Sequence, residues 1–251
     1  MRRISCWLSV VAFLVPASSA AGQRTTQLQF AAAYDHLSNG YDPWRTATLE
    51  LRTNGLGLSA HARVEETMRF SQLDHNVTLG VQRRMTSRFT VGGGAQVSPS
   101  HRVSPKWAAL GDVELAGRGG WGVLAAVRHL QYTSAPVTIS ATTVERYVSR
   151  YRAAYSLYAA RLQSERSIGH RVQGDVYYGH SSSSVGLAVS LGDEVESTLP
   201  NGVLRTSVRG AGVVGRQWLT PRWLLIYDAL VLQQGALYTR RRISIGLEHR
   251  F

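Results

Sequence analysis

The chain has 251 residues, of which 44% are hydrophobic and 18% charged, and its 28 Lys and Arg outnumber its 16 Asp and Glu to give a formal net charge of +12. No apolar run approaches the roughly 20 residues that a membrane-spanning helix needs, which excludes a helical membrane protein. The single cysteine excludes a disulfide scaffold. Aliphatic and aromatic residues recur along the whole chain, which argues against intrinsic disorder.

The first 22 residues have the pattern of a secretory signal peptide. Arg2 and Arg3 form a basic start, Trp7–Val15 is a short apolar run, Pro16 ends that run, and small residues fill 17–22. This order of basic, apolar and small residues is typical of segments that direct export and are then cleaved. We therefore expect residues 1–22 to be removed and residues 23–251 to form a single domain.

Beyond this segment, polar and apolar residues alternate with a period of two. In the last strand Ile243, Ile245 and Leu247 alternate with Ser244 and Glu248. Side chains along a strand point alternately to opposite faces, so this pattern predicts an all-β chain with one apolar face. About fourteen strands are expected, with twelve as the alternative. The expected strands are residues 27–37, 43–53, 56–68, 73–84, 88–98, 105–117, 120–132, 139–148, 151–163, 168–179, 184–193, 203–217, 221–232 and 240–251.

The connections between the expected strands alternate in length. Tight turns such as Asn54-Gly55 and Thr220-Pro221 follow the even-numbered strands, and longer loops such as 99–104, 194–202 and 233–239 follow most odd-numbered ones. Short periplasmic turns and longer outer loops are typical of bacterial outer-membrane barrels. The predicted fold is therefore a transmembrane, antiparallel, up-and-down β-barrel. Aromatic residues near the strand ends would form its interfacial girdles, namely Phe89, Trp121, Trp218 and Trp223 at the turns and Trp44, Trp107 and Tyr132 at the loops.

Several short motifs, in their order along the chain, resemble one family. They are Tyr41-Asp42-Pro43-Trp44-Arg45, Val144-Glu145-Arg146-Tyr147-Val148, Asp175-Val176-Tyr177-Tyr178-Gly179 and the terminal Gly246-Leu247-Glu248-His249-Arg250-Phe251. This combination looks like the YaiO family of outer-membrane β-barrels. The resemblance implies a barrel in the cell outer membrane, reached after export across the inner membrane, and it implies no established activity. The terminal Phe251 resembles the signal that the barrel-assembly machinery reads.

With the apolar face toward lipid, the charged face lines the barrel interior. The lumen-lining charged residues that we expect are Arg52, Arg63, Glu65, Arg84, Asp112, Glu114, Arg171, Asp175, Arg205, Arg209, Arg242 and Glu248. One interpretation is a structural network, because the planar guanidinium of arginine pairs well with carboxylates. The other is a cation-rich passage that favours anions. A barrel of twelve or more strands is wide enough for a lumen unless side chains or loops fill it.

Basic residues near the loops indicate a lipid partner. Arg240–Arg242 form one cluster at the expected outer rim, and His101, Arg102 and Lys106 form another. Such clusters could bind the phosphates of lipopolysaccharide through charge-assisted hydrogen bonds, or they could form a solvated rim. No nucleic-acid partner is expected, because the basic residues are spread over many strands of an exported chain. Asp193, Glu194 and Glu196 are expected in an acidic loop, which could bind calcium weakly but is better explained as solvated charge.

The sequence contains little that indicates catalysis. His180 beside Ser181–Ser184, with Asp175 nearby, is the nearest approach to a Ser–His site, but serines are also common in turns. GxSxG, HExxH and CxxC motifs are absent, so neither a metal nor a cofactor is expected. We expect a non-enzymatic barrel that forms a narrow or gated passage. The alternatives are an outer-membrane enzyme that modifies lipids and a structural or adhesive barrel that acts through its extracellular loops.

Overall fold

The computed structural model of the protein describes residues 3–4, 24–179, 183–198 and 202–251. These residues form fifteen strands and no helix long and apolar enough to cross a membrane. The strands are β1 (Arg3–Ile4), β2 (Thr25–Leu37), β3 (Trp44–Gly55), β4 (Leu58–Arg69), β5 (Gln72–Arg84), β6 (Phe89–Val97), β7 (Trp107–Ala116), β8 (Trp121–Gln131), β9 (Pro136–Val148), β10 (Tyr151–Leu162), β11 (Glu165–Tyr178), β12 (Ser183–Thr198), β13 (Gly202–Trp218), β14 (Trp223–Gln234) and β15 (Tyr238–Arg250).

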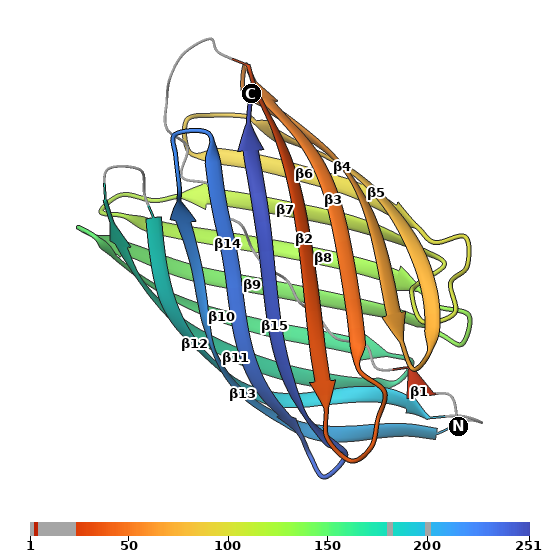
Figure 1. The fold of residues 1–251 in the computed structure, drawn as a ribbon. Helices are drawn as coiled ribbons and strands as arrows, with labels where there is room; N and C mark the ends of the chain where they lie inside the picture. Colours follow the sequence, from red (N-terminus) through yellow and green to blue (C-terminus); the bar gives the residue numbers. More distant parts are fainter. Residues whose placement is uncertain (1–2, 5–23, 180–182, 199–201) are drawn as a thin grey trace.

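Fourteen of these strands, β2–β15, form one closed antiparallel barrel (Figure 1). Each strand pairs with its neighbours in the sequence, and β15 pairs with β2 from Arg240↔Leu37 to Arg250↔Gln27, which closes the ring. The prediction of fourteen strands is confirmed, and twelve is excluded. The two-residue β1 pairs with the end of β12. The rest of the expected signal peptide lies outside the described residues, and its cleavage stays a prediction.

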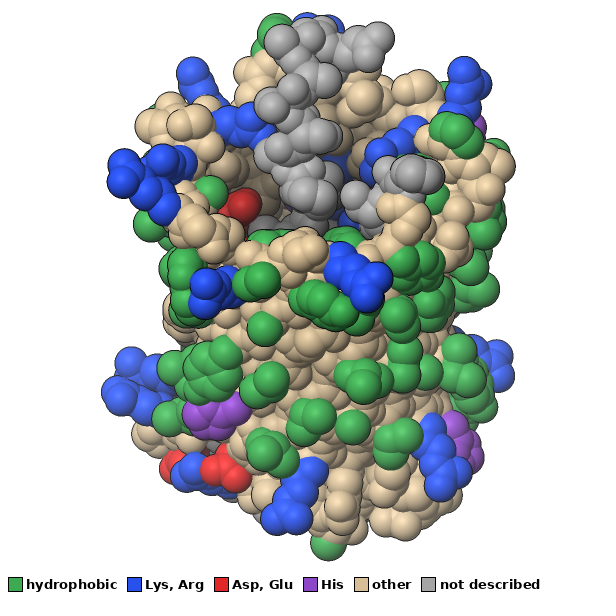
Figure 2. Space-filling model, turned by 90° about the vertical axis from the view of Figure 1, so that its left-hand side faces the viewer, with side chains coloured by type: hydrophobic (Ala, Val, Ile, Leu, Met, Phe, Trp, Pro, Cys, Tyr) green, Lys and Arg blue, Asp and Glu red, His purple; other side chains and the backbone are tan. Residues whose placement is uncertain are grey.

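The barrel has its apolar side chains outside and its charged side chains inside. Phe30 is 56% exposed and Ile243 69%, whereas Asp35 and Glu50 are only 2% and 4% exposed. Figure 2 shows hydrophobic side chains across the middle of one outer face, with Lys and Arg gathered toward the two ends. A barrel that folds in water has the opposite arrangement, so this surface suits contact with lipid.

The two ends of the barrel differ in their connections. One end, here called the turn end, holds Thr25, Gly179, Phe251 and the connections 56–57, 85–88, 117–120, 149–150 and 219–222. It is the upper end in Figure 1. The opposite end, here called the loop end, holds the connections 38–43, 70–71, 98–106, 132–135, 163–164 and 235–237.

The loop end has shorter loops than the sequence suggested. Among the described connections at this end the longest is 98–106, and the described residues of the expected loops 194–202 and 233–239 are mostly strand. β12 runs on to Thr198 and β13 begins at Gly202, because the two strands keep pairing as far as Thr198↔Gly202. Asp193 and Glu194 therefore lie on a paired strand and not in a solvated loop, which corrects that expectation.

The aromatic girdles are only partly as expected. Phe89, Trp121 and Trp223 point outward at the turn end, and Trp107 points outward at the loop end. Trp44 and Trp218 instead point inward, which corrects their assignment to the girdles. Trp44 is 1% exposed and packs against Phe70 and Tyr238. The guanidinium of Arg250 lies 4.1 Å from the ring centre of Trp218. Tyr132 packs against an apolar cluster inside the barrel.

Candidate functional site

The candidate site is the inner face of the barrel. An inward-facing side chain shares its parity with the buried residues of its strand. Of the predicted lumen-lining residues, the structure places these ten on inward-facing positions: Arg52, Arg63, Glu65, Arg84, Asp112, Glu114, Arg171, Asp175, Arg242 and Glu248.

Arg205 and Arg209 face outward, which corrects their predicted place in the lumen. They share the parity of Val213, which is 38% exposed, whereas Val208 on the opposite parity is 8% exposed. The cause is the composition of β13, where Gly210–Gly215 carries glycine and valine on both parities and gives no clear apolar face. Arg205 forms an ion pair with Asp193 on this outer side.

Glu50 holds two arginines on the wall formed by β3 and β4. Nη2 of Arg52 donates to Oε1 of Glu50 at 2.6 Å, while Nε and Nη2 of Arg63 donate to Oε2 at 2.7 and 2.5 Å. Arg63 and Glu50 are direct cross-strand partners, so the register of the two strands brings them together. One carboxylate therefore faces two guanidinium groups, and this part of the wall has a surplus of positive charge.

Arg152 joins two carboxylates on the opposite wall. Its Nε donates to Glu145 on β9 and its Nη1 to Asp175 on β11, both at 2.7 Å. The amide of Gln173 also donates to Asp175 at 2.9 Å. We did not predict Glu145 and Arg152 as lumen residues. The signal was present, because Tyr151, Tyr155 and Leu157 define the apolar parity of β10 and leave Arg152 on the other parity.

A third network lies at the seam where β15 meets β2. Asp35 accepts from Nε of Arg240 at 2.5 Å and lies 3.9 Å from Nη1 of Arg242, and Arg242 also lies 3.4 Å from Asp228. The rim cluster predicted at 240–242 is therefore divided by the strand. Arg240 and Arg242 point inward, and only Arg241 points outward. This corrects the prediction of one outer cluster of three arginines.

Over the whole described interior, positive and negative side chains are nearly equal in number. The inward arginines on the strands are Arg52, Arg63, Arg69, Arg84, Arg128, Arg152, Arg171, Arg216, Arg240, Arg242 and Arg250. The inward carboxylates are Asp35, Glu50, Glu65, Asp74, Asp112, Glu114, Glu145, Glu165, Asp175, Glu194, Asp228 and Glu248. The interior is thus rich in charge and close to neutral, although the chain as a whole is strongly basic.

Inward side chains narrow the loop end. Trp44, Leu37 and Tyr238 form one buried cluster on the inner wall, and the guanidinium groups of Arg69 and Arg240 lie 4.9 and 5.2 Å from the Trp44 ring centre. A second apolar cluster, made by Ala108, Leu130, Ala135, Val137, Ile139 and Leu162, covers the inner wall of β7–β10.

The loop 98–106 is held at the mouth of the barrel by Asp74. This carboxylate is 0% exposed and accepts from the backbone N–H groups of Arg102, Val103 and Ser104 at 3.0, 2.6 and 2.7 Å. Ser104 also accepts from the amide of Asn76 at 3.2 Å. His101 and Lys106, the other members of the predicted second basic cluster, lie on this loop with Arg102.

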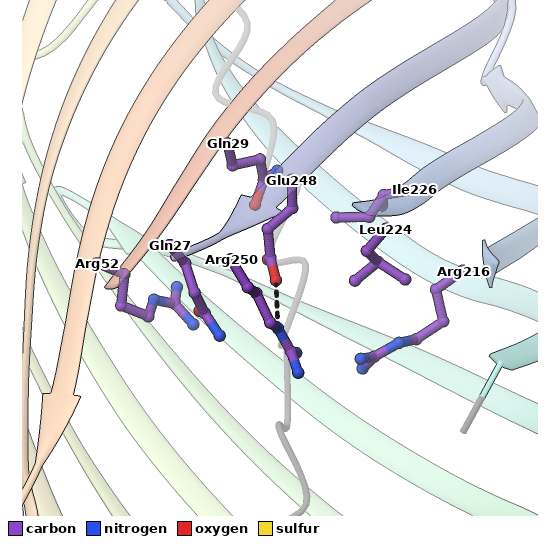
Figure 3. Close-up of a pocket in the computed structure, with 8 residues that line it drawn as sticks. All are labelled: Gln27, Gln29, Arg52, Arg216, Leu224, Ile226, Glu248 and Arg250. Atoms are coloured by element: carbon purple, nitrogen blue, oxygen red, sulfur yellow. Dashed lines mark hydrogen bonds and ion pairs between the residues drawn. The ribbon is translucent and has the colours of Figure 1, made fainter. Parts of the chain in front are cut away.

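A polar pocket lies inside the turn end (Figure 3). It is lined by Gln27, Gln29, Arg52, Arg216, Leu224, Ile226, Glu248 and Arg250, from strands that are consecutive around the ring. Nε of Arg250 donates to Glu248 at 3.2 Å. Among the described residues Arg216 forms no ion pair, so arginine exceeds carboxylate in this pocket as well.

The remaining predicted sites fall outside the lumen. Phe251 is 69% exposed at the turn end, and its backbone N–H donates to Thr26 at 2.9 Å. His180, Ser181 and Ser182 lie outside the described residues. The hydroxyl of Ser183 accepts from the backbone N–H of Trp218 at 3.1 Å, so it has a structural partner on the barrel wall.

Solved structures with a similar fold are outer-membrane barrels. A structure described as a bacterial polysaccharide outer membrane secretin aligns with a TM-score of 0.57 and 11% identity, over 90% of this chain and 98% of the other. The monoaromatic hydrocarbon channel CymD aligns with a TM-score of 0.57 and 6% identity, over 92% and 88%. An anion-selective porin from Comamonas acidovorans aligns with a TM-score of 0.51 and 10% identity, over 92% and 100%.

No curated protein matches the chain. A family model does: the YaiO membrane beta barrel domain matches residues 25–196, which is more than half of the chain. This match confirms the resemblance seen in the sequence motifs and identifies the apolar outer surface as a lipid-facing one. The chain belongs to the YaiO family of membrane β-barrels and resides in the outer membrane.

Proposed function

We propose that this barrel is a narrow, non-enzymatic passage for small polar solutes across the outer membrane. The observation that supports it best is the charged inner face of a closed barrel, which continues from the turn-end pocket to the seam network near the loop end. Water and polar solutes are stabilised by such a lining. The structural neighbours include proteins described as a hydrocarbon channel and an anion-selective porin, which is consistent with a passage.

The proposed passage is narrow because the loop end is partly filled. The Trp44 cluster, the apolar cluster on β7–β10 and the loop held by Asp74 all occupy inner space there. The loop 98–106 lies at the mouth of the barrel, where three hydrogen bonds to the carboxylate of Asp74 hold it. Release of these hydrogen bonds would open the mouth, so this loop is the segment that would gate the passage. The paired arginines would serve mainly to neutralise the wall, as in the structural-network interpretation. Arg216 and its neighbours at the turn end are the arginines left to meet a solute.

The outer surface of the barrel suggests two partners, lipopolysaccharide and the barrel-assembly machinery. We propose that outward basic residues at the loop end contact lipopolysaccharide phosphates. Arg161 and Arg166 are direct cross-strand partners there, and like charges in that position are destabilising unless an anion lies between them. We also propose that the barrel-assembly machinery recognises β15 through its outward Leu247 and Phe251. Both proposals assume that the turn end lies in the periplasm and the loop end outside the cell.

The test is single-channel conductance of the protein purified from outer membranes and inserted in a planar bilayer. Stable small steps are expected. In the variant Arg216→Cys, a negatively charged methanethiosulfonate reagent should change the step size, because this side chain lines the lumen. The matched control is Arg209→Cys, which faces outward on the same strand and should give unchanged steps. A folded barrel that gives no steps would contradict the passage.

The alternative functions have their own readouts. Loss of lipid turnover in His180→Ala cells would favour the lipid-modifying enzyme. Loss of partner binding after the loop 98–106 is shortened, with the barrel still assembled, would favour a structural or adhesive barrel that acts through its extracellular loops.

A further inference from the structure

Near the turn end, the inner wall carries charges of opposite sign on opposite sides. Arg52, Arg216 and Arg250, here called the arginine wall, lie on β3, β13 and β15. Asp112, Glu114 and Glu145, here called the acid wall, lie on β7 and β9. Each of the six residues is at most four positions before the turn end of its strand, so they occupy a similar depth in the barrel. The arginine wall is centred on β15 and the acid wall on β8, and these two strands are seven apart in a ring of fourteen, so the centres of the two walls face each other.

The arginine wall keeps a positive surplus after its ion pairs are counted. Arg52 shares Glu50 with Arg63, and Arg250 pairs with Glu248. Within the described part of the chain Arg216 pairs with no carboxylate, although its side chain lines the same pocket (Figure 3). In this group the two carboxylates of Glu50 and Glu248 thus face the four guanidinium groups of Arg52, Arg63, Arg216 and Arg250.

The acid wall keeps a negative surplus for the corresponding reason. Asp112 has only the amide of Gln82 as a side-chain partner, at 3.2 Å, and neither Asp112 nor Glu114 forms an ion pair among the described residues. Glu145 shares the single Arg152 with Asp175. Arg84, on β5, lies between the two walls.

Glycines let the acidic side chains lie flat against the barrel wall. A Cβ built on Gly92 would be 2.4 Å from Oδ1 of Asp112, and one built on Gly122 would be 2.9 Å from Oε1 of Glu145. The carboxylates of Asp112 and Glu145 therefore lie against the backbone of these two glycines, where any other residue would place a side chain.

We infer that the two walls form a selectivity girdle for small zwitterions, and this inference rests on the proposed passage. A simple anion is attracted by one wall and repelled by the other, so a girdle with balanced charge favours it little. A compact solute with a carboxylate at one end and an ammonium group at the other is stabilised at both walls when it lies across the passage. Walls of low dielectric constant concentrate the field between them. The substrate class is therefore small dipolar solutes of the amino-acid type.

The test compares three solutes of similar size in liposomes that contain the purified protein. Glycine is zwitterionic at neutral pH, glycolamide is uncharged and glycolate is an anion. For the native barrel, glycine should enter faster than glycolamide by about threefold or more, because a focused field raises the local concentration of a matching solute. The native barrel should also show little preference between potassium and chloride in a salt gradient.

Charge-removing variants test whether selectivity comes from the electric field between the two walls or from the net charge of the passage. Asp112→Asn with Glu114→Gln should make the barrel prefer chloride, and Arg52→Gln with Arg216→Gln should make it prefer potassium. Combining all four substitutions should restore weak ion preference and abolish the preference for glycine over glycolamide. Arg209→Gln, on the outer face, should behave as the native barrel.

The outcomes distinguish this inference from the proposed function. Equal entry of glycine and glycolamide through a conducting native barrel overturns the girdle and leaves the passage intact. Persistence of the glycine preference after all four substitutions also overturns the girdle. Failure of a folded barrel to admit any solute or ion overturns the passage itself.

Discussion

Arg240 donates to the carboxylate of Asp35 across the seam at which the last strand of the barrel meets the first strand of the ring. The two side chains are 2% and 3% exposed, and the nitrogen and oxygen are 2.5 Å apart. The guanidinium also lies over the ring of Trp44, 5.2 Å from its centre. Residues from the two ends of the barrel sequence thus form a buried contact where the ring closes.

Removing one partner of this pair should destabilise the barrel strongly. Arg240→Gln leaves the buried Asp35 without its closest cation, and breaking a buried pair in this way costs about 3–5 kcal/mol. Urea unfolding in detergent micelles, followed by tryptophan fluorescence, measures the change. Arg241→Gln, one residue further along and facing outward, is the control and should change stability little. Equal losses in the two variants would show that the seam pair has no special role.

The lipid-facing surface can be tested with one charge placed on either side of β15. Ile245 is 56% exposed on the outer face, and Ser244 faces inward opposite Asp228. Ile245→Arg should lower the free energy of unfolding by about 2–4 kcal/mol in a bilayer, the cost of an arginine near the membrane midplane. Ser244→Arg should cost much less, because its guanidinium can pair with Asp228. Equal stability of the two variants in liposomes would invert the assignment of the faces.

A glycine pair tests the close approach of carboxylates to the wall. A Cβ on Gly186 would be 2.1 Å from Oδ1 of Asp175 and 2.8 Å from the carbonyl oxygen of Gly174, whereas a Cβ on Gly174 would have nothing within 4 Å. Gly186→Ala should therefore destabilise the barrel by about 1–3 kcal/mol through overpacking. Gly174→Ala should be neutral or slightly stabilising, because alanine restricts the unfolded chain. The comparison is made by urea unfolding under the same conditions, and a Gly186→Ala variant as stable as Gly174→Ala would refute the crowding.

The loop 98–106 should be released when Asp74 is replaced. Asp74→Ala removes the acceptor of three backbone N–H groups, each of which costs about 1–3 kcal/mol when it is left buried and unsatisfied. The loop should then leave the wall. Trypsin should cleave at Arg102 or Lys106, and single-channel conductance should rise.

The control for this release removes a carboxylate from a neighbouring loop. Asp42 accepts from the hydroxyl of Ser71 and does not contact the loop 98–106 in any of the described hydrogen bonds. Asp42→Ala should leave both the trypsin pattern and the conductance unchanged. Cleavage at the same sites in both variants would mean that Asp74 is not the anchor.

The strands could be predicted from the sequence because alternation is a local property. Leu247, Glu248 and their neighbours show which residues share a face, without any knowledge of the partner strand. Strand ends were less predictable where composition resembles a loop. The acidic residues Asp193 and Glu194 suggested a solvated segment, but continued pairing of β12 with β13 keeps them in strand.

The direction in which a side chain points was unpredictable where both parities look alike. In β13 glycine and valine occupy both faces between Gly210 and Gly215, so Arg205 and Arg209 were assigned to the wrong side. Trp44 shows the same difficulty at a strand end, where an aromatic ring suits either an outer girdle or an inner cluster. Which charges meet is a matter of register between strands. Arg152 joins Glu145 and Asp175 only because three strands align in one way.

The closure of the ring by its last strand also determines when the barrel can be completed. Residues 238–250 follow all the other strands of the ring in the sequence, and without them β2 and β14 each have a free edge of unpaired N–H and C=O groups. Free edges of this kind recruit other strands and cause aggregation. The barrel can therefore be completed only if these two edges are kept from pairing with other chains until the last strand is in place.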